Sequence, residues 1–274
     1  MRRSRAMRPL AGLLALLAAC VAAAEAPRFD DRSSMALPAT VRALEASSFA
    51  VDAPSPAMEA MLADPAGWSP PSAPGDPGIE RLRSLIRFDR DGWIKASALN
   101  WPGDEGWTLW MRWSRRGAAA PGAIETTLAP PAGSGGAVHP LGGGTIRYPD
   151  PLSQEIELDT RRPGQPPERF ARTNRFDADG RLQAWSSRTQ REGADAERED
   201  YEVVSRDAAG RPDRARQRRG GAWYDLSVRY LGADDRGQPL RSLRLFRPQG
   251  AGEDAAPVRA ELTLYGYRYD DEAR

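Results

Sequence analysis

Three residue types that carry much of protein chemistry are almost missing from this chain. Its 274 residues include one cysteine, Cys20, one histidine, His139, and one lysine, Lys95. A single cysteine forms no internal disulfide, so packing and hydrogen bonds must hold the fold. One histidine disfavours a Ser-His-Asp triad, and it leaves no donor set for a His-rich zinc site or a Cys-His dyad. We therefore expect no catalytic residue of these kinds, no metal and no cofactor.

Long apolar runs are also missing beyond the first residues. After residue 24 no stretch approaches 18 consecutive apolar residues, so we predict no transmembrane helix there. The start is different, because four arginines (residues 2, 3, 5 and 8) precede an apolar run from Leu10 to Ala19. A basic stub followed by a short apolar segment is typical of an export signal. We expect residues 1–19 to be that signal.

Cys20 lies directly behind the apolar run, in Leu17-Ala18-Ala19-Cys20. This motif resembles the lipobox of bacterial lipoproteins. The resemblance implies that Cys20 becomes the lipid-modified first residue of a mature protein anchored to a membrane. Val21, where inner-membrane lipoproteins carry aspartate, favours the outer membrane. The alternative is cleavage after residues 22–24 and secretion as a soluble or periplasmic protein.

The charge balance does not favour binding to nucleic acid. Loss of the four signal arginines reduces the 39 basic side chains to 35, against 38 acidic ones. Nucleic-acid binding needs a basic excess that displaces counterions, so we expect no nucleic-acid partner.

The chain divides at about residue 80. Residues 20–80 are rich in proline, alanine and serine, and they predict a tether with one or two short helices, one opening at Leu37 to Thr40 and the other at Ser55-Pro56. From residue 81 the hydrophobic period is two, clearest in Tyr224 to Tyr230. Strand follows strand without an intervening helix. We predict a mainly β domain over 81–274, an antiparallel meander whose sheet is an open or closed barrel, behind a short helical N-terminal arm.

Short Asp and Gly turns separate several of these strands. Phe176 to Leu182 repeats Phe88 to Ile94, and looser copies occur at Arg206 to Arg211 and Asp235 to Leu240. Aspartate initiates a type I turn and glycine closes it in the left-handed conformation. The copies resemble bacterial YD repeats of the Rhs type, which implies hairpins. A calcium loop is disfavoured, because arginine occupies the first ligand position.

Two clusters stand out as candidate sites. The tryptophans at 101, 107, 110 and 113 are candidates for a face that binds sugar, peptide or lipid, although packing in the core is the favoured explanation for them. The arginines between 211 and 219 face carboxylates if residues 208–210 form a three-residue loop, with Glu202 opposite Arg216 and Asp200 opposite Arg218. We therefore expect a self-neutralised hairpin rather than an anion site. His139 lies in a glycine-rich stretch that reads as a loop.

These observations favour a non-catalytic periplasmic or outer-membrane lipoprotein that binds a partner protein, an envelope glycan or a lipid. Trp101, Trp107, Trp110 and Trp113 are the candidate binding residues, and Cys20 is the candidate lipidation site. Two alternatives stay open. One is a two-carboxylate hydrolase of envelope polysaccharide, and the other is a lipid-carrying half-barrel with an apolar cavity. A transmembrane β-barrel is disfavoured by the polar strands and the hydrophilic end of the chain.

Overall fold

The strands join edge to edge into a closed ring. The structure, a computed structural model, describes residues 26–70, 79–100, 107–115, 121–131, 133–162, 164–252 and 254–270. Two helices and fourteen strands follow one another in these parts of the chain: α2 (Asp31–Ser34), β1 (Val41–Asp52), α3 (Pro56–Ala63), β2 (Ile79–Phe88), β3 (Ile94–Asn100), β4 (Thr108–Ser114), β5 (Gly122–Ala129), β6 (His139–Arg147), β7 (Ser153–Thr160), β8 (Glu168–Phe176), β9 (Leu182–Arg191), β10 (Glu197–Arg206), β11 (Pro212–Arg219), β12 (Ala222–Ala233), β13 (Pro239–Pro248) and β14 (Arg259–Tyr269). No described helix is long and apolar enough to cross a membrane.

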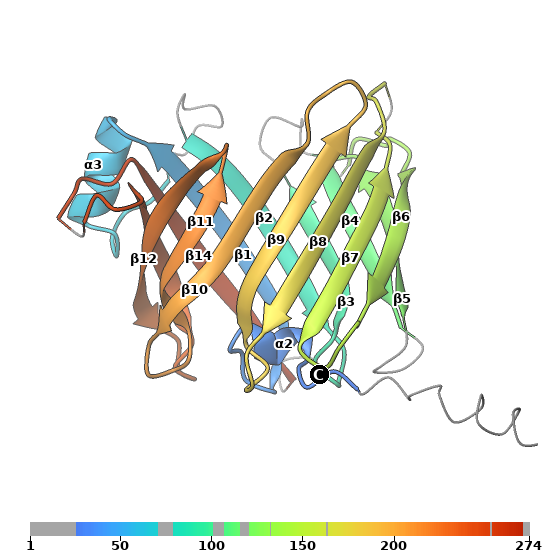
Figure 1. Cartoon of the computed structure of the whole chain (residues 1–274), viewed down its shortest axis with the longest axis horizontal. Coiled ribbons are helices and arrows are strands. Elements are labelled where there is room, and N and C mark those ends of the chain that lie inside the picture. The colour runs from blue at the N-terminus through green and yellow to red at the C-terminus, as the bar shows by residue number, and fades with distance from the viewer. Residues whose placement is uncertain are drawn as a thin grey trace, which may run out of the picture.

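The topology is an up-and-down meander. Each strand pairs antiparallel with its sequence neighbours, and β1 closes the ring by pairing with β14 as well as β2. Figure 1 shows the strands tilted across the barrel wall. The prediction of a mainly β meander that closes as a barrel is confirmed.

The N-terminal arm differs from the tether expected over residues 20–80. Val41–Asp52, part of it predicted as helix, is strand β1. Its alanines and serines favour no clear alternation, so only the strand partners on both sides reveal its conformation. The second predicted helix is confirmed as α3, which Ser55 caps by accepting a hydrogen bond from the Met58 N–H.

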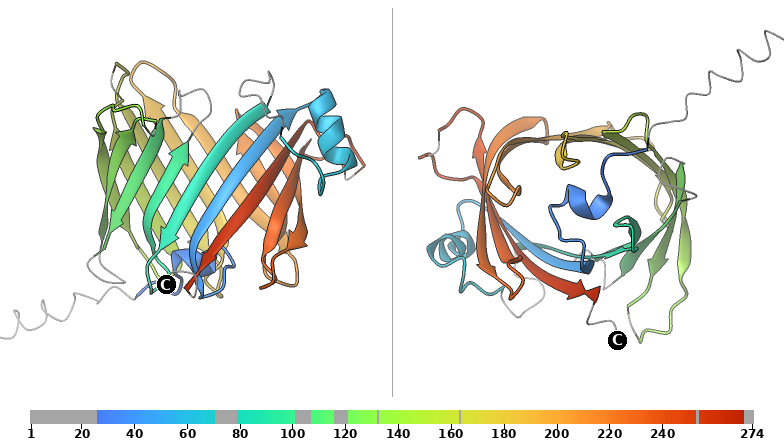
Figure 2. Two further views of the ribbon diagram at one scale, coloured as in Figure 1. Left: turned by 180° about the vertical axis from the view of Figure 1, so that it is seen from behind. Right: turned by 90° about the horizontal axis from the view of Figure 1, so that it is seen from below.

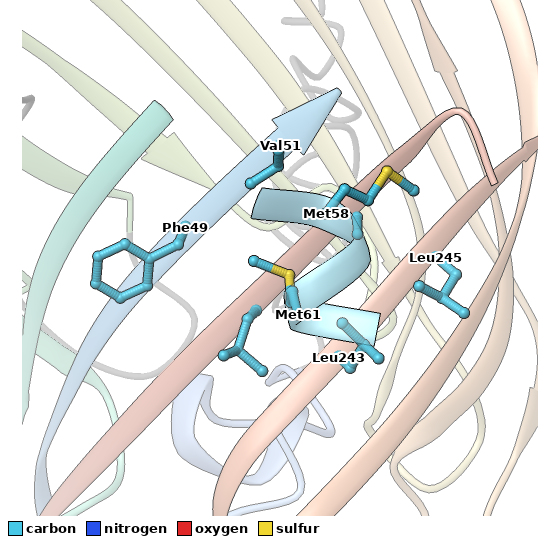
Figure 3. Packing of buried hydrophobic residues seen from close by; sticks show 8 residues of the cluster. Phe49, Val51, Met58, Met61, Leu243 and Leu245 are labelled. Carbon is cyan, nitrogen blue, oxygen red and sulfur yellow. The ribbon is translucent and has the colours of Figure 1, made fainter. Parts of the chain in front are cut away.

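Helix α3 covers an apolar area on the outside of the barrel. Seen from below, α3 lies beside the ring of strands (Figure 2). Met58 and Met61 pack against Phe49 and Val51 of β1 and against residues of β13 and β14, as Figure 3 shows. Met61 is fully buried at 0% exposure, although it projects from a surface helix. The helix therefore shields outward-facing apolar side chains from water.

Helix α2, at the start of the N-terminal arm, lies inside the ring at one end of the barrel (Figure 2). We call residues 28–35 the plug, and this end of the barrel the plug end. The Arg32 N–H donates to the Gly92 carbonyl (2.9 Å), and the Arg28 N–H donates to the Pro151 carbonyl (2.9 Å). Phe29 stacks on Phe176 with ring centroids 3.6 Å apart. A third turn also touches this segment, since a Cβ at Gly180 would lie 2.7 Å from the Arg28 carbonyl oxygen. The turns of three different hairpins therefore hold the plug.

Four turns at the plug end share one hydrogen-bond pattern. The aspartates at positions 89, 177, 207 and 234 each receive backbone N–H groups on their side chains, and a glycine three residues later donates back to the aspartate carbonyl. The predicted Asp-to-Gly turns are confirmed, although the fourth begins at Asp234 rather than Asp235. All four have φ between +77° and +91° at that glycine. Only glycine adopts this conformation at little cost.

We predict that Asp207 makes folding stability depend on pH in the acid range. Burial alone would raise the pKa of Asp207, but hydrogen bonds from Arg211 and the Arg211 charge outweigh it, so the net pKa is lowered. A lowered folded pKa gives stability that is present above the unfolded pKa and is lost as pH falls through the folded pKa. Urea unfolding from about pH 5 to about pH 2 should show a smaller loss of stability in Asp207→Asn than in the native protein. Equal slopes in both proteins would contradict this role.

Candidate functional site: the barrel lumen

The two faces of the sheet differ sharply in chemistry. On β7, Gln154, Ile156 and Leu158 line a cavity inside the ring, whereas Glu157 and Asp159 between and after them are exposed on the outside. The same alternation continues along the wall. Outward positions on β8 to β11 include arginines and acids at 169, 175, 188, 202 and 214, all exposed. The outer face of β7 to β11 is therefore charged, unlike the apolar outer band of a barrel that faces lipid.

The larger cavity of the lumen has a volume of about 520 Å³. Its size falls in the range of small-molecule sites. Half of the 24 residues that line it have apolar side chains: Met35, Ile94, Leu99, Leu109, Met111, Trp113, Leu141, Ile156, Leu158, Phe170, Phe176 and Leu182. Asp31, Ser34 and Met35 of the plug border the same cavity. An apolar molecule placed here would be shielded by α2 from water at the plug end.

A second cavity of about 380 Å³ occupies the other half of the lumen. Its most polar part is Arg244, which lies 3.6 Å from Glu261 among tyrosines of β10, β12 and β14. Burial acts to lower the pKa of Arg244, but the Glu261 charge and the tyrosines outweigh it and raise the pKa overall. Burial also raises the pKa of Tyr230, so its hydroxyl stays protonated and donates to the Pro212 carbonyl. This half is a network of paired polar groups.

Arg172 projects into the larger cavity from the middle of β8. Its Nε donates to Asn174 Oδ1 (2.7 Å), and its guanidinium lies 4.5 Å from the centroid of the Trp185 ring. Trp185 in turn stacks on Tyr201, 5.8 Å between centroids. Burial lowers the pKa of Arg172 to about 10, and the charge of Glu199 opposes this effect. Arg172 stays charged at neutral pH, with neutral groups as its direct partners.

The acids that border the cavities are all in ion pairs. Asp31 pairs with Arg115 (3.0 Å), and Glu261 pairs with Arg244. Glu168 and Glu197 at the rim both pair with Arg191, at 2.7 and 3.7 Å. Within the described residues, no three His, Cys, Asp or Glu side chains gather as metal ligands. Among the described residues that line these two cavities, no unpaired carboxylate is present that could serve as the acid or base of a two-carboxylate hydrolase.

The four candidate tryptophans do not form one face. Trp113 lines the larger cavity and its indole N–H donates to Ser97 Oγ (3.3 Å). Trp110 pairs with Ala98 and Thr127 on the outer face of the wall. The Trp107 ring lies 5.8 Å from the ring of His139. Trp101 and Cys20 lie outside the described residues.

The glycine-rich segment around His139 is the loop that we expected only over residues 133–138, which belong to no helix or strand. Its last residues form strand β6, where Gly144 pairs with Ile124 and Leu158. A Cβ at Gly144 would lie 1.7 Å from the Glu157 carbonyl oxygen, so the glycine allows the two backbones to approach. The glycine run indicates close strand packing, and sequence reasoning mistook it for flexibility.

The arginine-rich hairpin pairs as predicted. Glu202 lies opposite Arg216, and Asp200 lies opposite Arg218 with 3.7 Å between their charged groups. Arg216 also lies 3.4 Å from Asp225 on β12. The arginines meet carboxylates on both neighbouring strands, so this surface offers little net attraction for an anion.

Residues of the lumen wall were largely missed by sequence reasoning. Arg172, Trp185 and Tyr201 lie on β8, β9 and β10 and were not candidates. The strand Glu168–Phe176 carries arginine on both faces, so its residue types do not reveal which face is inward. Strand pairing supplies that information, because Arg172 lies opposite Ile156 and Ser187.

Comparison with known proteins gives only distant likenesses. No family model and no curated protein matches the chain. A porin-like protein from Bacteroides vulgatus shares 13% identity, with a TM-score of 0.39 over 71% of this chain and 95% of the other. A porin-like protein from Bacteroides uniformis shares 5%, with a TM-score of 0.30 over 83% and 98%. A protein from Nitrosomonas europaea assigned as AttH shares 10%, with a TM-score of 0.23 over 83% and 93%. Likenesses this weak carry no argument about function.

We predict that the buried Asp31–Arg115 pair holds the plug in the lumen. Asp31 also accepts hydrogen bonds from the Ile94 N–H (2.8 Å) and from Gln154 Nε2 (3.2 Å). Asp31→Ala leaves the Arg115 charge buried without a partner, which should lower the free energy of unfolding by about 3–5 kcal/mol in urea titrations. The double variant Asp31→Leu, Arg115→Leu should recover most of that loss. A double variant as unstable as the single one would rule out the ion pair as the cause.

Proposed function

We propose that this protein is a non-catalytic binding protein that holds a lipid-like apolar molecule inside the barrel. The observation that carries the proposal is the alternation of the wall, with charged side chains outside and an apolar cavity of about 520 Å³ inside. Burial of an apolar ligand in such a cavity is favourable by roughly 25 cal/mol per Å² of surface removed from water. The charged exterior suits a barrel that stands in water.

The proposal narrows the three ligand classes expected from the sequence to the lipid. A glycan-binding face needs aromatic rings gathered on an accessible surface, whereas Trp110 and Trp113 lie on opposite faces of β4. The lipid carrier was expected as a half-barrel, and a closed ring with an unfilled apolar interior meets the same requirement. Closure also surrounds a bound chain with the barrel wall.

Binding inside the lumen can be tested with a substitution that fills the larger cavity. Leu158→Trp places an indole in that space, and Glu157→Trp places the same side chain on the outside one residue earlier. In titrations with the neutral dye N-phenyl-1-naphthylamine, we expect saturable binding to the native protein and to Glu157→Trp. Leu158→Trp should bind at least about 10-fold more weakly, because the indole occupies space that the dye would fill and the surrounding wall expands only at a cost. Circular dichroism confirms that both variants fold.

Two results would contradict lumenal binding. One is an absence of saturable dye binding to the native protein. The other is an equal affinity in the two tryptophan variants, because a dye on the outer surface would not distinguish them.

We further propose that the barrel works in the periplasm, tethered to the outer membrane through a lipid on Cys20. The signal-like N-terminus and the lipobox resemblance support this location. The described chain begins at residue 26, so the plug lies close in sequence to Cys20 and the plug end would face the membrane. This part of the proposal is independent of what the lumen holds.

We predict that Cys20→Ser abolishes membrane anchoring. Without the thiol no lipid can be attached, so the variant should lose its membrane association and accumulate as unprocessed precursor. Cell fractionation with a carbonate wash, followed by immunoblotting, measures both effects. Unchanged processing and unchanged membrane association would show that the protein is exported without a lipid.

A further inference from the structure

Three arginines lie deep inside the ring, and their partners differ. Arg115 contacts Asp31 at 3.0 Å, and Arg244 lies 3.6 Å from Glu261. Arg172 has no ion pair with any described carboxylate; its contacts are Asn174 Oδ1 and the Trp185 ring. The first two charges are neutralised within the protein. The third is not.

A buried charge without a counter-ion is costly to the empty protein. Removing a guanidinium from water costs several kcal/mol unless an anion and hydrogen bonds compensate. The Trp185 ring and the Asn174 amide recover part of this cost. The nearest further acid, Glu199, lies across the neighbouring strand and is 3.8 Å from Arg219. Replacement of Arg172 by an apolar side chain should therefore leave the empty barrel as stable as before, or more stable.

The two terminal nitrogens of Arg172 are free to bind something else. Only Nε is used within the described chain, in the bond to Asn174. A guanidinium presents its donors as a planar fork that matches the two oxygens of a carboxylate or phosphate. Arg172 borders the larger cavity, where Leu158, Phe170 and Met111 also lie. Arg191, which also borders this cavity, is already paired with the rim acids Glu168 and Glu197. The guanidinium of Arg172, beside these apolar side chains, fits one charged headgroup joined to an apolar chain.

We infer that Arg172 binds the anionic headgroup of an amphipathic ligand, a long-chain carboxylate or monoalkyl phosphate, whose chain occupies the apolar larger cavity. This inference rests on the proposed function and adds the ligand's charge to it. The position of Arg172, midway along β8 between Glu168 at the rim and Phe176 at the plug, places the headgroup inside the lumen. The rim acids, Glu168 and Glu197, are already paired with Arg191 and would repel an anion held at the mouth.

The test compares ligands that differ only in the headgroup. Hexadecanoate, hexadecyl phosphate and hexadecanol are titrated into delipidated protein by displacement of N-phenyl-1-naphthylamine. The native protein should bind at least one of the two anions about 10- to 100-fold more tightly than the alcohol, because a charge-assisted bond to a buried guanidinium adds to the burial of the chain. The tighter anion identifies the headgroup.

Variants of Arg172 assign the preference to this residue. In Arg172→Met the preference for the anion should fall to within about 3-fold, with hexadecanol binding retained and the urea midpoint unchanged or raised. Arg172→Lys should show an intermediate preference, because an ammonium cannot bind both oxygens. Arg175→Met, three residues along β8 and exposed on the outer face, is the matched control and should behave like the native protein.

The outcomes separate this inference from the proposed function. Equal affinity of the native protein for anions and alcohol would overturn the headgroup site and leave the apolar carrier standing. Binding of neither class would overturn both. If Arg172→Met still prefers the anion, another residue binds the headgroup. If Arg172→Met is destabilised or fails to fold, Arg172 has a structural role. Either result overturns the inference.

Discussion

Closure of fourteen strands fixes how this molecule must be built. A ring of about eight strands is just wide enough for side chains to fill, so a wider ring leaves space that side chains cannot occupy. The protein fills part of that space with α2 and the residues before it, since Arg28, Phe29 and Asp31 contact three hairpins. It fills another part with the network around Arg244 and leaves the larger cavity empty. The lumen is a consequence of the strand number, and its apolar lining is a property of the sequence.

The pleat then decides what each side of the wall can contact. Successive residues of a strand point to opposite faces, so one strand carries Leu158 toward the cavity and Glu157 toward water. Where the outer face is apolar, around Phe49 and Val51, α3 covers it with Met61. The two helices thus have different roles: α3 shields apolar side chains on the outside from water, whereas α2 occupies part of the lumen at the plug end.

The turns and many single strands of this fold can be predicted from the sequence, whereas the pairing of distant strands cannot. Asp-to-Gly turns and clean alternation, as in Tyr224 to Tyr230, indicate hairpins from a few neighbouring residues. The strand Val41–Asp52 is hidden, because its small residues suit several conformations and one of its partners, β14, lies 207 to 228 residues away in the sequence. Arg172 is hidden for a related reason. Nothing in its own segment distinguishes it from the outward Arg169 and Arg175, and only the register with β7 and β9 places it inside.

The plug at one end of the ring affects how a ligand could enter and leave the lumen. A tube open at both ends is a conduit, and matter crosses it while the protein stays still. In this barrel Phe29, Arg32 and Asp31 hold α2 inside one end, so the proposed ligand would exchange mainly at the other end. A carrier of the proposed kind would release its ligand by the end through which the ligand entered, so net transfer would require that end to meet a donor at one moment and an acceptor at another. Capacity is then set by the number of copies and their encounter rate rather than by a flux through each one.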